Sequence, residues 1–90
     1  MPRVKFTRNL QRFFPGLPPV EVDGRTVAEI FHNLEALYPG LTAYFVDDQG
    51  ALREHVNVFI GEELIHDRSR LSDAVGAADQ VFIFQALSGG

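Results

Sequence analysis

Residues 26–40 read TVAEIFHNLEALYPG and carry signals for both the start and the end of a helix. Thr26 and Glu29 form a capping box, in which the Thr26 hydroxyl accepts a hydrogen bond from the Glu29 amide and the Glu29 carboxylate reaches back to the Thr26 amide. At the other end, Pro39 cannot continue a helix and restricts the residue before it. The apolar residues between these signals recur at three- and four-residue spacing: Ile30, Phe31, Leu34, Leu37 and Tyr38. We therefore expect one amphipathic helix that packs on another layer.

The segments on both sides of this helix alternate apolar and polar residues, which is the period of a half-buried strand. We expect strands in VKFTRNLQRFF (4–14), VEVDG (20–24), HVNVFI (55–60), LI (64–65) and VFIFQAL (81–87). PGLPP joins the first two as a hairpin, and SRLSDAVGAADQ (69–80) is expected to be a helical turn and loop. The order β-β-α-β-short β-β predicts an α+β fold with a mixed sheet of four or five strands and one main helix on one face.

A single helix covers only one face of such a sheet and leaves the other to solvent or to a partner. If Val81 and Ile83 pack beneath the helix, Phe82 and Phe84 point outward, and the same alternation turns Phe59 outward. Two alternatives remain open: residues 41–52 fold over these rings, or the two faces are exchanged. Contiguous exposed apolar area commonly marks a protein interface. We therefore predict a partner interface made of Phe59, Phe82, Phe84, Ala86 and Leu87.

Composition excludes several classes of function. Ninety residues fit a single domain spanning 1–90, and a net charge of −4 without clustered Lys and Arg argues against nucleic acid. No apolar run is long enough to span a membrane, which predicts a cytoplasmic protein, expected to be a monomer when free. The chain has no Cys, hence no thiolate nucleophile, and its carboxylates and three His recur at no metal-ligand spacing.

The last strand leads into a short tail, residues 86–90, that ends in Gly89 and Gly90. Glycine is costly to order and has no side chain to pack, so this pair adds little to a fold and predicts a flexible tail. Five residues extend at most about 17 Å, which is enough to enter the active site of a partner. Ser88 and Gly89 are small enough to thread a narrow channel there.

Over essentially its whole length the sequence resembles the MoaD/ThiS family of ubiquitin-like β-grasp sulfur carriers. The resemblance lies in VKF, TVAEIFHNLEALYPGL, HVNVFIGEELI and DQVFIFQALSGG, and it is nearest to the longer carriers of the cysteine-biosynthesis type. By position, Phe84 matches the outward aromatic residue that the family carries six residues before its final Gly. The resemblance implies a β-grasp fold and an interface role for Phe84.

The resemblance also implies a function for the terminus. A partner adenylating enzyme would use ATP to activate the Gly90 carboxylate, and sulfide or a persulfide would then displace AMP to leave a thiocarboxylate. The partners implied are this enzyme, a sulfur donor and a sulfur-acceptor synthase, with no permanently bound cofactor and no catalytic side chain in the carrier itself. Three alternatives remain open: a molybdopterin synthase small subunit, a ubiquitin-like modifier joined to lysines through Gly90, and a pure binding module whose glycines are only a loose end.

Overall fold

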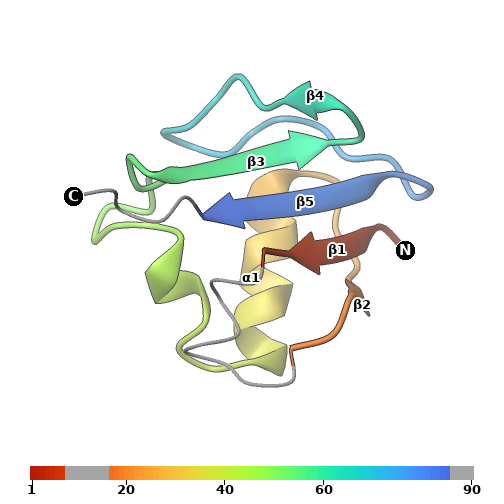
Figure 1. The fold of residues 1–90 in the computed structure, drawn as a ribbon, viewed down its shortest axis with the longest axis horizontal. Coiled ribbons are helices and arrows are strands. Elements are labelled where there is room, and N and C mark those ends of the chain that lie inside the picture. The colour runs from red at the N-terminus through yellow and green to blue at the C-terminus, as the bar shows by residue number, and fades with distance from the viewer. Residues whose placement is uncertain (8–16, 86–90) are drawn as a thin grey trace.

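The computed structural model describes residues 1–7 and 17–85. Within these residues the chain forms one five-stranded sheet in the order β2-β1-β5-β3-β4 (Figure 1). The strands β1 and β5 are parallel, whereas the other neighbours are antiparallel. The elements along the chain are β1 (Arg3–Phe6), β2 (Val20–Glu21), α1 (Val27–Leu37), the 3-10 helix η2 (Thr42–Tyr44), β3 (Val56–Ile60), β4 (Glu63–Leu64) and β5 (Gln80–Gln85). The mixed sheet, the element order and the single main helix are confirmed.

The N-terminus of α1 is closed by its own side chains and by a distant loop. Thr26 Oγ1 accepts from the Glu29 amide at 3.2 Å, as expected for a capping box. The Glu29 carboxylate, however, accepts from the Arg25 amide at 3.1 Å and not from the Thr26 amide that the capping box predicted. The next free amides of the helix, those of Val27 and Ala28, donate to carbonyls of residues 73 and 71.

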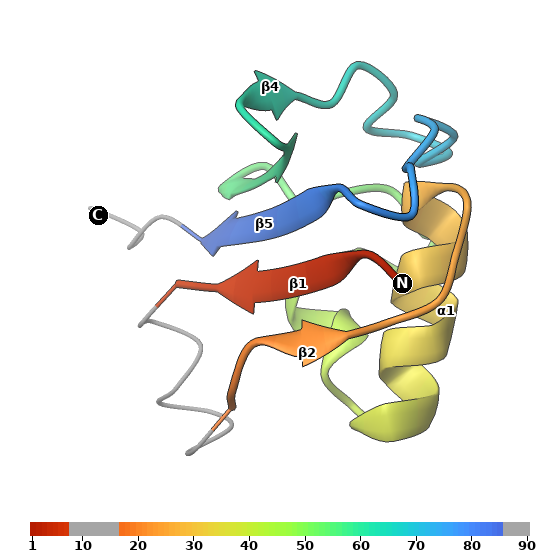
Figure 2. The same cartoon turned by 90° about the vertical axis from the view of Figure 1, so that its right-hand side faces the viewer.

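The other end of α1 departs from the expected apolar stripe. Ile30, Phe31 and Leu34 are buried, but the Leu37 side chain is 54% exposed. Leu37 lies in the last turn, and Figure 2 shows this end of α1 running beyond the edge strand β2, where none of the described strands lies beneath it. The expectation that Leu37 belongs to the packed face is therefore wrong.

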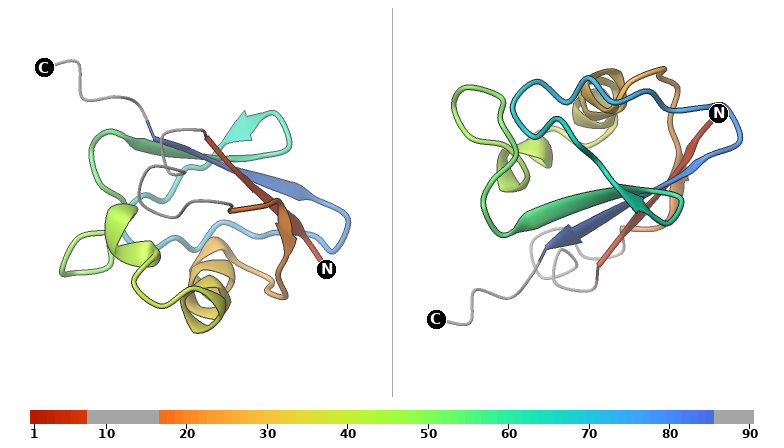
Figure 3. Two further views of the ribbon diagram at one scale, coloured as in Figure 1. Left: turned by 60° about the horizontal axis from the view of Figure 1, so that its bottom comes forward. Right: turned by 90° about the horizontal axis from the view of Figure 1, so that it is seen from above.

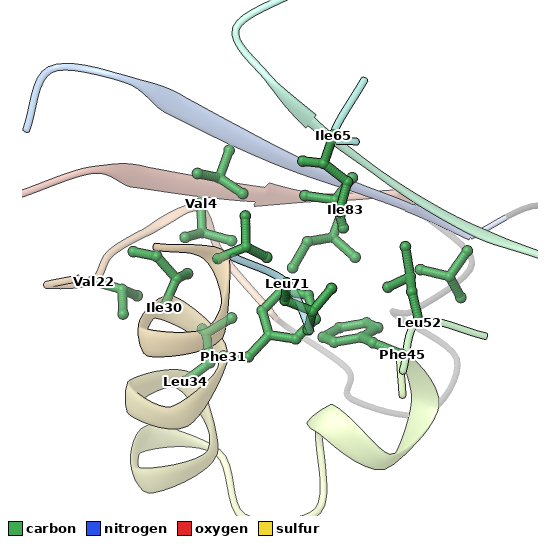
Figure 4. Close-up of a cluster of buried hydrophobic side chains, with 14 of the residues drawn as sticks. Val4, Val22, Ile30, Phe31, Leu34, Phe45, Leu52, Ile65, Leu71 and Ile83 are labelled. Atoms are coloured by element: carbon green, nitrogen blue, oxygen red, sulfur yellow. The ribbon is translucent and has the colours of Figure 1, made fainter. Parts of the chain in front are cut away.

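The core lies between the sheet and a layer made by α1 and residues 41–52 (Figures 3 and 4). Phe45 is fully buried in this layer, and its ring lies 5.5 Å from Phe31 and 6.3 Å from Phe6. The sheet contributes Val4, Val56, Val58, Val81 and Ile83, all without exposed area. Because residues 41–52 pack on the same side as the helix, they do not fold over Phe59, Phe82 and Phe84.

Residues 65–79 connect β4 to β5 without forming a helix, which corrects the expected helical turn in 69–80. Two carboxylates order this loop instead. Asp67 accepts hydrogen bonds from the Ser72 hydroxyl and from the amides of Ser69, Arg70 and Ser72, and Asp73 accepts from the amides of residues 66 and 67. These bonds lower the pKa of both carboxyl groups, chiefly through the Ser72 hydroxyl for Asp67 and the His66 amide for Asp73.

Candidate functional site

The side of the sheet that faces away from α1 carries the aromatic residues singled out in the sequence. Val81 and Ile83 of β5 are fully buried, so the residues that alternate with them, Phe82 and Phe84, lie on the outer face. Phe84 is 39% exposed and Phe82 is half-buried. In β3, Val56 and Val58 are buried, so the residues that alternate with them, Asn57 and Phe59, lie on this same outer face. The predicted orientation of all three rings is confirmed, while their role in binding stays a prediction.

Strand register joins these rings into one surface. Phe82 pairs with Phe59 across β5 and β3, and Phe59 pairs in turn with Leu64 of β4, which is 46% exposed. The Phe84 ring lies 6.3 Å from the Phe82 ring with the planes tilted by 37°. We call Phe59, Leu64, Phe82 and Phe84 the outer patch. The sequence did not single out Leu64, because a two-residue strand has no period that would reveal its face.

The neighbours of the outer patch are polar, and several are cationic. Lys5 of β1 pairs with Phe82, and Arg3 lies two residues earlier on the same face. On the other side, the Arg68 guanidinium donates to Asn57 Oδ1 at 3.0 Å and to the Arg53 carbonyl at 2.7 Å. Arg3 and Lys5 of β1 therefore flank the outer patch.

The patch adjoins the point from which the tail leaves the sheet. Gln85, the last residue of β5, pairs with Val56 of β3, and its amide donates to Thr7 Oγ1 at 3.3 Å. The strand that delivers the tail is thus held on both sides up to its end. The predicted tail and interface residues Ala86, Leu87, Ser88, Gly89 and Gly90 lie outside the described residues, so their roles stay predictions.

The described residues contain no group of three or more His, Asp and Glu side chains that could hold a metal ion. The three His are exposed and separate, and the Asp47 carboxylate accepts from the amides of residues 49 and 51 within its own turn. No helix in the described part of the chain is long and apolar enough to cross a membrane.

An open hollow of about 290 Å³ lies on the helix side, lined in part by Phe31, His32, Glu35 and Arg70. Glu35 is already engaged there, since its carboxylate accepts from the Gly40 amide at 2.6 Å and from the amide and hydroxyl of Thr42. These bonds, led by that of Gly40, lower the pKa of Glu35. This carboxylate therefore fastens the turn after α1 and is poorly placed to act as a base.

A five-stranded mixed sheet with one helix, an open aromatic face and a tail issuing from a central strand defines the class of small ubiquitin-like β-grasp proteins. The family model described as the ThiS family matches residues 4–90. The chain belongs to the ThiS family.

Individual relatives agree with this membership. The chain is 30% identical over 77 residues to the sulfur carrier protein CysO of Mycobacterium tuberculosis, with 83% of each chain covered. It is 35% identical over 69 residues to small archaeal modifier protein 3 of Haloferax volcanii, covering 76% of this chain and 73% of that protein. Among solved structures, a chain from the Amycolatopsis orientalis BexX/CysO complex superposes with a TM-score of 0.86 at 28% identity and full coverage of both chains.

Proposed function

We propose that this protein is a sulfur carrier whose Gly90 carboxylate is adenylated by a partner enzyme and converted to a thiocarboxylate. The observation that carries the proposal is the outer patch on β5, because a partner that docks there receives the tail that continues from the same strand. Membership of the ThiS family and similarity to CysO sulfur carriers support it. The sulfur would pass to the biosynthesis of cysteine or of another sulfur-containing metabolite or cofactor, such as molybdopterin or thiamine.

The chemistry requires activation because a carboxylate is a poor electrophile. A Gly90 carboxylate oxygen attacks the α-phosphorus of ATP, which gives an acyl-adenylate and releases pyrophosphate. Hydrosulfide then attacks the carbonyl carbon, the bond to the adenylate oxygen breaks, and AMP leaves with the electron pair. The carrier contributes docking and a narrow terminus, and the partner enzyme contributes the polar groups that stabilise the charge developing on the phosphate.

The absence of cysteine gives a direct assay. After incubation with the cognate adenylating enzyme, ATP and sulfide, a thiol-alkylating reagent should label the protein once, and fragmentation should place the label on Gly90. A chain lacking Gly90 is the matched control and should remain unlabelled. Equal labelling of the two chains, or no labelling of the full chain under conditions in which its ATP is consumed, would contradict the proposal.

A second candidate function is protein modification through a Gly90–lysine isopeptide, which similarity to small archaeal modifier proteins 3 and 1 favours. The last Arg of the chain is Arg70, so trypsin would leave residues 71–90 on a modified target. Chymotrypsin, which cleaves after Leu87, shortens this remnant to Ser-Gly-Gly without any change to the tail. Host lysines that carry the long remnant after trypsin and Ser-Gly-Gly after chymotrypsin would establish modification, whereas remnants with neither protease would leave only the carrier role.

A further inference from the structure

Lys5 is the one lysine among eight basic residues in the sequence. The number of lysines decides how many side chains an activated terminus could acylate. A neutral lysine amine is readily acylated, whereas an arginine guanidinium stays protonated and is not acylated. Apart from the α-amine of Met1, the chain therefore offers a single amine to its own acyl-adenylate.

The structure places that amine on the outer face. Lys5 pairs in register with Phe82 on the parallel neighbour strand, and within the described residues its side chain makes no hydrogen bond or ion pair. It is half-buried among its strand neighbours and extends from the same side of the sheet as the outer patch. A partner docked on the outer patch would cover it.

Lys5 also lies within the span of the tail. It is level with Phe82, three residues before Gln85, which is about 10 Å along the strand and about 5 Å across to the next strand. Residues 86–90 can span at most about 17 Å, so Gly90 can return over the outer face to Lys5.

The α-amine is at the other end of the sheet. Because β1 and β5 are parallel, the chain starts where β5 begins, as Figure 1 shows. Arg3 is level with Gln80, already about 17 Å back from Gln85, and Met1 lies two residues further away. The tail therefore reaches Lys5 and falls short of Met1.

We propose that Lys5 Nζ is an acyl-acceptor site for the chain's own activated terminus. When no partner covers the outer face, an internal amide forms between Lys5 Nζ and Gly90. The neutral amine nitrogen attacks the Gly90 carbonyl carbon, the bond to the leaving group breaks, AMP or a thiol departs with the electron pair, and the amine proton goes to solvent. The product has no terminal carboxylate and cannot be loaded again. This inference rests on the proposed function, because it concerns the same activated carbonyl.

The test needs no adenylating enzyme, so its failure is distinct from failure of the proposed function. The full chain is prepared as a Gly90 thioester by intein cleavage, held at mildly alkaline pH and followed by intact mass. The internal amide is lighter than the hydrolysed chain by one water, and trypsin should join residues 4–8 to residues 71–90. Short flexible linkers give effective concentrations near 1 mM, so at about 10 µM protein the internal amide should exceed the covalent dimer about 100-fold.

Two variants serve as controls. Lys5→Arg should only hydrolyse, and Lys5→Arg/Arg70→Lys, which moves the lysine to the loop beside α1, should do the same. Urea should slow amide formation in the wild type, because unfolding separates Lys5 from Gly90 by nearly the whole chain. Hydrolysis alone in the wild type, a bond mapped to Met1, a predominant dimer, an equal rate in the Arg70→Lys double variant, or acceleration in urea would each overturn the inference.

Discussion

Truncation of Phe84 to alanine should weaken docking of the adenylating enzyme while the domain stays folded. A phenylalanine presents about 150–250 Å² of surface, so its 39% exposure leaves about 60–100 Å² for a partner to cover. At about 25 cal/mol per Å², this area is worth about 1.5–2.5 kcal/mol, or about a 10- to 70-fold increase in Kd. The fold should lose only about 1–2 kcal/mol, because Phe84 is partly exposed, lies outside the buried core and has the Phe82 ring as a neighbour.

The assay is titration of each variant into the cognate adenylating enzyme, with thermal unfolding measured in parallel. Leu37→Ala is the matched control, because Leu37 is 54% exposed on α1, away from the outer patch. Because Leu37 lies away from the outer patch, its truncation should leave the Kd for the adenylating enzyme within about twofold of the wild-type value. The reasoning fails if Phe84→Ala binds like the wild type, or if Leu37→Ala weakens binding equally.

Three further predictions concern the scaffold. Gly24→Ala should destabilise by more than about 2 kcal/mol in urea unfolding, because its Cβ would lie 2.9 Å from the Ile30 amide nitrogen at a φ of +152°; an unchanged midpoint would contradict this. Thr26→Ala should cost about 1 kcal/mol through loss of the helix cap, whereas Thr26→Ser should retain most of it. The pKa of Asp73 in the folded state lies below its ordinary value of 3.8. The contribution of this carboxylate to the free energy of unfolding is therefore fully present above pH 3.8 and is lost as the pH falls further. Asp73→Asn should flatten the dependence of the urea midpoint on pH below 4, and an unaltered slope would show that this carboxylate does not contribute.

Local sequence patterns predicted the elements of this fold more completely than their pairing. The capping box and Pro39 delimit α1 because helix ends are decided by nearby residues. The exposure of Leu37 was not predictable, since periodicity describes a helix face but not how far the sheet extends beneath it. The loop ordered by Asp67 and Asp73 was missed for a related reason, because the spacing of two carboxylates does not indicate that their oxygens accept from five backbone amides.

In the candidate site, too, features within one strand were predictable and features that depend on pairing between strands were not. Alternation within β3 and β5 predicted that Phe59, Phe82 and Phe84 face outward. The contiguity of the patch depends on register between strands, which joins Phe59 to Leu64 and sets Lys5 beside Phe82. Such pairings link residues far apart along the chain, so a single sequence does not specify them.

The position of β5 between β1 and β3 also determines how the protein responds to force. A partner that holds the outer face and draws on the terminus pulls β5 along its own axis, parallel to β1 and antiparallel to β3. Such a load shears the hydrogen bonds of both ladders together, whereas a load directed across the strands would break them one after another. The domain therefore resists a pull on its terminus along the axis of β5.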